Sequence, residues 1–233
     1  MTNIAKNLEI VLSQINYACQ NAQRSFDDLL LLAVSKTRSA EELAIAYEKG
    51  QRHFGENYLQ EALDKIEQLN SLDICWHFIG PIQSNKTRAI AENFDWVHSV
   101  DRLKIAQRLS AQRPDQTPPL NICLQINISE EESKSGILPN QLPELATQIL
   151  ALPNIRLRGL MAIPASSSDP IQQRKPFQQM QQLLQQLKQQ HPDHPELDTL
   201  SMGMSGDMEA AIAEGATIVR IGTAIFGARD YSK

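Results

Sequence analysis

The sequence predicts an α/β protein that folds as a single closed (βα)8 barrel with an extra N-terminal helix. Three observations support this prediction. Eight short apolar runs of the kind that forms buried β-strands recur along the chain, and a helical pattern separates each consecutive pair. The chain has 233 residues, close to the roughly 250 residues of a typical (βα)8 barrel. We therefore expect residues 1–233 to form one domain.

The eight expected strands are short and predominantly apolar. They are 29–35 (LLLLAVS), 52–56 (RHFGE), 76–80 (WHFIG), 95–100 (DWVHSV), 120–128 (LNICLQINI), 156–163 (RLRGLMAI), 199–203 (TLSMG) and 217–222 (TIVRIG). Periodicity does not distinguish a closed barrel from an open doubly wound sheet, so the open sheet is the competing architecture. No GxGxxG motif follows any of these runs.

The helices expected between the strands carry an apolar stripe at helical spacing. They cover 40–49, 58–70, 85–93, 102–113, 142–152, 171–190 and 206–214. A further amphipathic helix precedes the first strand, with Ile4, Leu8, Val11 and Ile15 on one face. That pattern differs from the continuous apolar region of a secretory signal.

Composition excludes several functional classes. The 22 Lys and Arg against 27 Asp and Glu give a net charge of −5, which provides no positive field for nucleic acid or anionic lipid. The longest apolar run spans residues 29–34, whereas crossing a bilayer needs roughly 20 residues. Three cysteines without a CxxC pair favour a reducing cytoplasm over a disulfide framework or a zinc site. His191 and His194 have a metal-like spacing but no further ligands nearby, so we expect no metal site.

In a (βα)8 barrel the functional side chains gather at the carboxyl ends of the strands. Lys36 follows the first apolar run and shares side-chain parity with Leu32 and Val34, so we expect it to project into the barrel mouth. Desolvation there would lower the pKa of the ammonium group and favour an amine that attacks a carbonyl carbon. The alternative is a lysine that extends to solvent from a strand end.

A candidate anion site lies at the other end of the chain. Ser205 and Gly206 directly precede the expected helix 206–214, with Asp207 in its first turn, and helix N-termini bind anions. Gly222 and Thr223 end the last strand, and the loops after strands seven and eight of such barrels often bind phosphate. Ser205 could instead only cap its helix. The occurrence of these residues together with Lys36 favours a phosphate site.

Two further polar residues lie inside apolar strands. Arg220 must find an acceptor inside the barrel or reach its mouth, and a structural ion pair is the alternative to a binding role. His77 is flanked by Trp76 and Phe78, a setting more typical of a core histidine than of a catalyst.

Six motifs resemble the pyridoxal-phosphate homeostasis protein family, also called the YggS or PROSC family. They are AVSKTR around Lys36, HFGENYLQE from His53, WHFIGPIQSNK from Trp76, LRGLMAIP from Leu157, LSMGMSGD from Leu200 and RIGTAIFGARDY from Arg220. The resemblance covers nearly the whole chain. It implies a barrel related to the N-terminal domain of alanine racemases (fold type III) that carries pyridoxal 5′-phosphate (PLP) as a Schiff base on Lys36.

The resemblance also implies roles for other residues. Arg220 would face the pyridine nitrogen of PLP. The phosphate would be held by Ser205, Gly222 and Thr223, with help from Met204 and Ser201. Asn57, His77 and Met161 would line the pocket for the ring.

The function implied is a carrier or regulator that binds PLP and acts in vitamin B6 and amino-acid homeostasis, with transient contact with apo-enzymes. A racemase-like enzyme is the alternative. We expect no turnover and a monomer, because the chain ends at Lys233 without the C-terminal β-domain that supplies a catalytic tyrosine in racemases. A weaker third hypothesis is an aldolase-like barrel in which Lys36 binds a sugar phosphate. Lys134, in the segment 130–136 (EEESKSG), is either a handover point for PLP or, as we favour, a solvated lysine balancing three glutamates.

Overall fold

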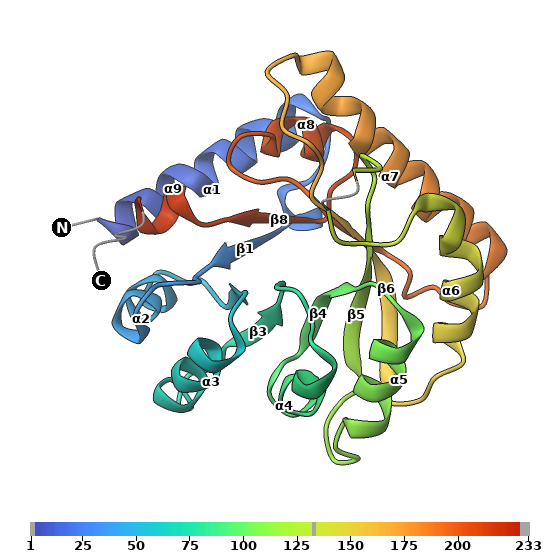
Figure 1. Ribbon diagram of the computed structural model, residues 1–233. Coiled ribbons are helices and arrows are strands. Elements are labelled where there is room, and N and C mark those ends of the chain that lie inside the picture. The colour runs from blue at the N-terminus through green and yellow to red at the C-terminus, as the bar shows by residue number, and fades with distance from the viewer. Residues whose placement is uncertain (1–2, 132–133, 229–233) are drawn as a thin grey trace.

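The eight strands close into a parallel barrel. The computed structural model describes residues 3–131 and 134–228. The strands run in the order β1 to β8, and β8 pairs with β1 (Figure 1). Their bounds are β1 Leu30–Val34, β2 His53–Glu56, β3 Cys75–Phe78, β4 Trp96–Val100, β5 Leu120–Ile126, β6 Ile155–Ala162, β7 Thr199–Ser201 and β8 Ile218–Ile221. The closed barrel is therefore confirmed, and the open sheet is excluded.

A helix precedes β1, and helices separate the successive strands. Their bounds are α1 Ile4–Asn21, α2 Ala40–Glu48, α3 Leu59–Gln68, α4 Thr87–Asn93, α5 Leu103–Gln112, α6 Leu142–Leu150, α7 Pro170–Gln190, α8 Met208–Ala213 and α9 Thr223–Phe226. Three 3₁₀ turns, η1 Phe26–Asp28, η2 Ser84–Lys86 and η3 Pro139–Gln141, lie in the connections. No helix among residues 3–131 and 134–228 is long and apolar enough to cross a membrane.

Two helices near the C-terminus differ from the prediction. The helix expected from Gly206 begins at Met208, so Asp207 is its N-cap residue rather than part of its first turn. The reason is a turn in which Asp207 Oδ1 accepts a hydrogen bond from the Met204 backbone N–H at 2.6 Å. The short helix α9 was not predicted, and it begins at Thr223, directly after Gly222.

Alternation along the strands separates an apolar outer layer from a polar interior. Phe54, Phe78, Val97 and Val219 belong to the main apolar core, which they share with the surrounding helices. The intervening positions include the buried polar residues His77, His98, Ser201 and Arg220. The barrel therefore places its hydrophobic core between strands and helices, and it encloses polar groups along its axis.

The N-terminal helix joins the first and last parts of the chain. It packs against α2, α8 and α9, and it lies alongside α8 and α9 in Figure 1. Asn7 Nδ2 donates to the Ile225 carbonyl oxygen at 2.9 Å, and Arg24 Nη1 donates to the carbonyl oxygens of Ile212 and Ala216 at 2.8 and 2.7 Å. These contacts stabilise the wall where β8 meets β1, beside the candidate site.

Candidate functional site

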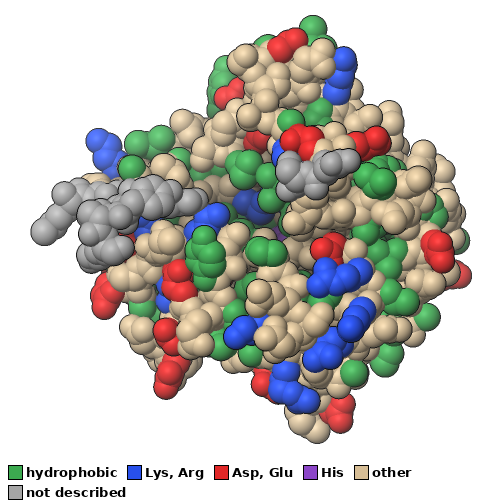
Figure 2. Space-filling view, viewed as in Figure 1, with side chains coloured by type: hydrophobic (Ala, Val, Ile, Leu, Met, Phe, Trp, Pro, Cys, Tyr) green, Lys and Arg blue, Asp and Glu red, His purple; other side chains and the backbone are tan. Residues whose placement is uncertain are grey.

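A cavity of about 300 Å³ lies at the carboxyl ends of the strands. Its volume is at the small end of the range for small-molecule sites, roughly 300–1,000 Å³. Lys and Arg side chains are visible inside the hollow near the middle of the face in Figure 2. The lining residues come from β1, β6 and β8, from the loops that follow the strands and from the start of α9: Val34, Lys36, Arg38, Asn57, Ile79, Met161, Ile163, Met204, Ser205, Gly206, Arg220, Gly222 and Thr223.

The structure brings together most of the residues that the sequence singled out. Eight of the ten line the cavity: Lys36, Asn57, Met161, Met204, Ser205, Arg220, Gly222 and Thr223. His77 and Ser201 do not line it, whereas we expected His77 at the ring pocket and Ser201 near the phosphate. The reason is that the His77 ring is stacked on Trp96, with centroids 5.5 Å apart, and its Nδ1 lies 2.9 Å from His98 Nε2. Both residues lie in the polar interior that adjoins the cavity.

Lys36 is two residues beyond β1, in a turn whose neighbouring residues, Ser35 and Thr37, are fixed by hydrogen bonds from their backbone N–H groups. Thr37 has a positive φ of 63°, a conformation that brings its backbone N–H to Glu61 Oε1 at 2.6 Å. On the other side, the Ser35 backbone N–H donates to the Gly55 carbonyl oxygen at 3.0 Å. The backbone carrying Lys36 is thus bonded to β2 and to α3.

A buried ion pair lies beneath this turn, and sequence reasoning missed it. Lys65 Nζ donates to the Ser35 carbonyl oxygen and to Glu56 Oε1, both at 2.8 Å, and it also pairs with Glu61. Ser35 Oγ donates to Glu56 Oε1 at 2.6 Å. Burial raises the pKa of the Glu56 carboxyl, and the nearby Lys65 ammonium opposes that shift. The apolar spacing of α3 carries no signal for this pair, because a lysine at 4% exposure is rare.

Arg220 places a cation in the wall of the cavity. It is 4% exposed, and burial lowers the pKa of its guanidinium to about 10, so it remains charged at neutral pH. Nη1 donates to the Ser201 carbonyl oxygen at 2.6 Å and to Ser201 Oγ at 2.9 Å, and Nη2 donates to the Ala162 carbonyl oxygen at 2.9 Å. These bonds use three of the five N–H donors of a guanidinium. No carboxylate among the described residues forms an ion pair with it, which suits a site that receives an acceptor or an anion.

A chain of hydrogen-bonding side chains runs from Arg220 through the barrel. His98 Nδ1 lies 2.7 Å from Ser201 Oγ, and His77 Nε2 lies 3.0 Å from His53 Nδ1. With the contact between His77 and His98, the chain connects five strands. Burial lowers the pKa of His98 to about 3 and that of His77 well below its usual value, so both rings are neutral. His98 was not singled out from the sequence. Its side chain lies on the same face of β4 as that of Trp96, because the two positions are two residues apart.

The loops after β7 and β8 contribute Met204, Ser205, Gly206 and Gly222 to the cavity lining. Gly203 has a φ of +96°, and a Cβ there would lie 2.6 Å from Ala211 Cβ, so the loop packs tightly onto α8. At Gly206 a Cβ would meet nothing within 4 Å, which leaves open space beside Ser205. In α9 the backbone N–H groups of Ile225 and Phe226 donate to the Gly222 carbonyl oxygen at 2.9 Å, which leaves those of Thr223 and Ala224 without an acceptor within the helix. Hydroxyls and amides therefore meet at one end of the cavity, as an anion requires.

Asn57 provides a test of whether the cavity suits a polar ligand. Its Oδ1 is buried and has no hydrogen-bond partner among the described residues. A buried acceptor without a partner costs about 1–3 kcal/mol, so a donor supplied by a ligand would remove that cost. The lysine amine, the guanidinium, the hydroxyls and this amide suit a small aromatic aldehyde phosphate, and the residues present therefore fit PLP.

Other residues considered from the sequence lie outside the cavity lining. Lys134 Nζ pairs with Glu131 Oε1 at 3.2 Å and lies 3.4 Å from the Ile163 carbonyl oxygen, while Glu132 and Ser133 are outside the described residues. His194 Nδ1 lies 3.0 Å from Glu196 Oε1, and His191 Nε2 lies 3.4 Å from Thr147 Oγ1.

Arg38, which sequence reasoning missed, lines the cavity and donates to the Gly227 carbonyl oxygen at 2.6 Å.

Comparison with known proteins gives consistent matches over the whole chain. The family model described as alanine racemase, N-terminal domain, matches residues 10–230. The pyridoxal phosphate homeostasis protein of Pseudomonas aeruginosa is 58% identical over 231 residues, covering 99% of this chain and 98% of its own. The protein of the same name from Escherichia coli K12 is 55% identical over 236 residues and covers 100% of both chains.

Solved structures agree with these matches. PipY of Synechococcus elongatus, in a structure with PLP bound, is 38% identical with a TM-score of 0.84, covering 97% of this chain and 100% of that one. Alanine racemase from Corynebacterium glutamicum, at 16% identity and a TM-score of 0.66, shares the fold over 60% of its own length. The predicted family is thus confirmed: this chain belongs to the pyridoxal phosphate homeostasis proteins, within the family of the alanine racemase N-terminal domain.

Proposed function

We propose that the protein binds PLP in the cavity at the barrel mouth, covalently through Lys36 Nζ, and acts as a carrier in PLP homeostasis. The observation that carries the proposal is the convergence in one small cavity of a lysine from the β1 loop, the buried Arg220 and the loops after β7 and β8. The condensation joins Nζ to the aldehyde carbon through a C=N bond and releases one water. Relatives named for PLP homeostasis and a PLP-bound structural neighbour support it.

Arg220 would donate a hydrogen bond to the pyridine nitrogen. A guanidinium does not give up its proton, so the ring nitrogen opposite it would remain unprotonated. When bound, PLP supplies an electron sink, and an unprotonated ring is a weaker sink than one paired with a carboxylate. The Arg220 side chain thus favours storage of the cofactor over stabilisation of a carbanion.

Ser205, Gly206, Gly222 and Thr223 would hold the phosphate. Their hydroxyls and backbone groups lie at the end of the cavity where α8 and α9 begin. At Gly222 a Cβ would lie 3.0 Å from the Val34 carbonyl oxygen, so glycine allows the backbone to lie close to β1. Asn57 would accept from the bound ring, and Met161 would contact its face.

We further propose that the protein does not turn over amino acids. Racemisation needs a base on one face of the substrate and an acid on the other. Among the described residues that line the cavity, no His, Asp, Glu or Tyr side chain accompanies Lys36 as a second proton-transfer group. The cavity lining does not include Tyr17, Tyr47 or Tyr58. Tyr231 lies outside the described residues.

The carrier would work as a monomer in the cytoplasm, exchanging PLP with apo-enzymes through the open mouth. The three cysteines are unpaired, as in a reducing compartment. Light scattering during size-exclusion chromatography is expected to give the monomer mass of 26.1 kDa. Transfer of PLP to an apo-enzyme is measured by the activity it regains, and a mass twice as large or no transfer would reject this part.

The decisive experiment combines absorption spectroscopy with borohydride reduction and mass mapping. PLP added to the protein is expected to give a visible band that borohydride removes, leaving a reduced adduct on Lys36. Lys36→Ala is expected to lose both signals, whereas the control Lys134→Ala retains them. An adduct that maps elsewhere, or a band that survives Lys36→Ala, would overturn the proposal.

Turnover is tested separately on the PLP-loaded protein. Exchange of the α-proton of amino acids in D2O, followed by NMR, is expected to be no faster than with free PLP. Faster exchange that is lost in Lys36→Ala would replace the carrier with an enzyme. The binding and turnover parts can therefore fail independently.

A further inference from the structure

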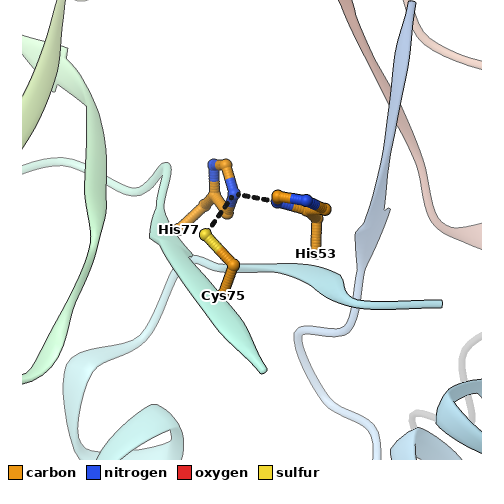
Figure 3. A group of neighbouring side chains, drawn as sticks. All are labelled: His53, Cys75 and His77. Atoms are coloured by element: carbon orange, nitrogen blue, oxygen red, sulfur yellow. Dashed lines mark hydrogen bonds between the residues drawn. The ribbon is translucent and has the colours of Figure 1, made fainter. Parts of the chain in front are cut away.

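Three side chains of metal-ligand type meet at the end of the barrel opposite to the cavity. His53 is the first residue of β2 and Cys75 the first residue of β3, and the two are direct partners in the parallel pairing. His77 lies two residues after Cys75, so both side chains are on the inner face of β3. Figure 3 shows the two imidazole rings and the thiol pointing toward one another.

The spacing of the three ligand atoms suits a tetrahedral cation. His77 Nε2 lies 3.0 Å from His53 Nδ1 and 3.4 Å from Cys75 Sγ, and all three atoms lie within 4.8 Å of one another. Zinc bonds of roughly 2.0–2.1 Å to nitrogen and 2.3 Å to sulfur place tetrahedral ligands about 3.3–3.6 Å apart. The two short distances would need to change by a few tenths of an ångström, and His53 Nδ1 and Cys75 Sγ would need to move closer together. The three atoms would then occupy three corners of a tetrahedron around the ion.

The central ligand is already oriented. His77 is fully buried, its ring is stacked on Trp96, and its Nδ1 lies 2.9 Å from His98 Nε2. A metal-binding histidine commonly bonds through its second ring nitrogen to a neighbouring acceptor, which fixes the tautomer. With the proton on His77 Nδ1 directed to His98 Nε2, the Nε2 lone pair is available to a cation. His98 would then donate from Nδ1 to Ser201 Oγ.

The site is also reachable and suitably charged. His53 and Cys75 are half-buried, so solvent reaches the open side of the cluster. The negative charge of the Asp95 carboxylate acts on both side chains and attracts a cation. Burial, together with Asp95, raises the pKa of the Cys75 thiol to about 12, so the metal must displace the thiol proton. Thiolate and imidazole are both ligands that Zn²⁺ binds, and the same donor set also suits copper.

We propose that His53 Nδ1, Cys75 Sγ and His77 Nε2 bind Zn²⁺ at the N-terminal end of the barrel. The thiol gives its proton to solvent as the Zn–S bond forms, and water occupies the fourth position. The bound ion joins β2 to β3 and stabilises this end of the barrel. The three ligands do not line the cavity proposed for PLP, so the two proposals are tested by separate experiments.

The test is titration of the full-length, chelator-treated protein with Co²⁺ and then Zn²⁺ under reducing conditions. One equivalent of Co²⁺ is expected to produce the visible bands of a tetrahedral ion and a near-ultraviolet thiolate charge-transfer band. One equivalent of Zn²⁺ should remove both. No bands, when metal and protein are present at equal micromolar concentrations, would overturn the proposal.

Variants locate the site. Cys75→Ser is expected to lose the charge-transfer band, and His53→Gln, at a half-buried position, is expected to lose stoichiometric binding. His98→Gln should weaken binding by about 10–100-fold through loss of the bond that orients His77. The matched controls Cys19→Ser and His194→Gln should bind as the wild type does. Bands that persist in both Cys75→Ser and His53→Gln, or that vanish in a control, would place the metal elsewhere and overturn the proposal.

Discussion

Arg220 Nη1 donates two hydrogen bonds to Ser201, to its carbonyl oxygen at 2.6 Å and to its hydroxyl at 2.9 Å. The same hydroxyl lies 2.7 Å from His98 Nδ1. Ser201 therefore connects the cation in the cavity wall to the neutral histidines inside the barrel. A cation held this firmly by neutral groups can serve as a fixed partner for a ligand without being neutralised by a carboxylate.

Replacing the Ser201 hydroxyl should cost stability without changing the cavity lining. Ser201→Ala leaves one Arg220 N–H and one His98 nitrogen without a partner, which is expected to lower the free energy of unfolding by about 1–3 kcal/mol. Urea denaturation measures this difference in the free energy of unfolding, and the m-value is expected to stay unchanged. The control Ser13→Ala, on the exposed face of α1, should differ from the wild type by less than about 0.5 kcal/mol. Equal effects of the two substitutions would show that the Ser201 bonds contribute nothing.

Acidification should destabilise the protein through His98. Its pKa is depressed to about 3 in the fold, mainly by burial and further by the charge of Arg220, and is near 6.5 when unfolded. The unfolded state therefore binds the extra proton between these values, and stability is lost as pH falls below 6.5. Between these two pKa values, His98 lowers the free energy of unfolding by about 1.4 kcal/mol for each pH unit of acidification.

Urea denaturation of the chelator-treated protein at pH 7.5, 6.5 and 5.5 measures this slope. His98→Gln should show a shallower slope than the wild type. Ser99→Ala, which removes a neighbouring buried hydroxyl but no titrating group, should keep the wild-type slope. A slope in His98→Gln equal to that of the wild type would contradict the assignment to His98.

The buried pair beneath Lys36 gives a third prediction. Lys65→Met leaves the Glu56 carboxylate buried without its cation, and breaking such a pair typically costs about 3–5 kcal/mol. The double variant Lys65→Met/Glu56→Gln removes both charges and should recover most of that loss. Arg88→Met, which breaks the exposed pair with Glu92, should cost less than about 1 kcal/mol. If the double variant were no more stable than Lys65→Met, the unpaired charge would not be the cause.

A pair of alanine substitutions tests the loop after β7. At Gly203, alanine must adopt a φ of +96° and place its Cβ 2.6 Å from Ala211 Cβ, so a loss of about 2–4 kcal/mol is expected. At Gly206 the new Cβ meets nothing within 4 Å, and the change should stay within about 0.5 kcal/mol. Thermal denaturation of the two variants compares them directly. Similar midpoints would mean that the loop moves away from α8 at little cost.

The sequence by itself determined the alternation of strands and helices, the strand ends at which Lys36 and Arg220 lie, and the family. These follow from local signals: apolar periodicity, strand parity and motifs that are contiguous in the chain. Boundaries at α8 differed because the Asp207 side chain closes a turn with Met204, a contact that the apolar pattern does not carry.

Only the tertiary structure decided how the polar interior is connected. The sequence predicted a closed barrel but not its internal contacts, and closure brings Ser201 of β7 to His98 of β4, 103 residues away. In the structure the His77 ring lies against His98 instead of lining the cavity, and the pairing of β2 with β3 places His53 and Cys75 beside it. The buried bond of Lys65 to Glu56 likewise depends on how α3 packs on β2. Such contacts arise from packing in three dimensions, because the free energy of a buried polar group depends on neighbours that are distant in sequence.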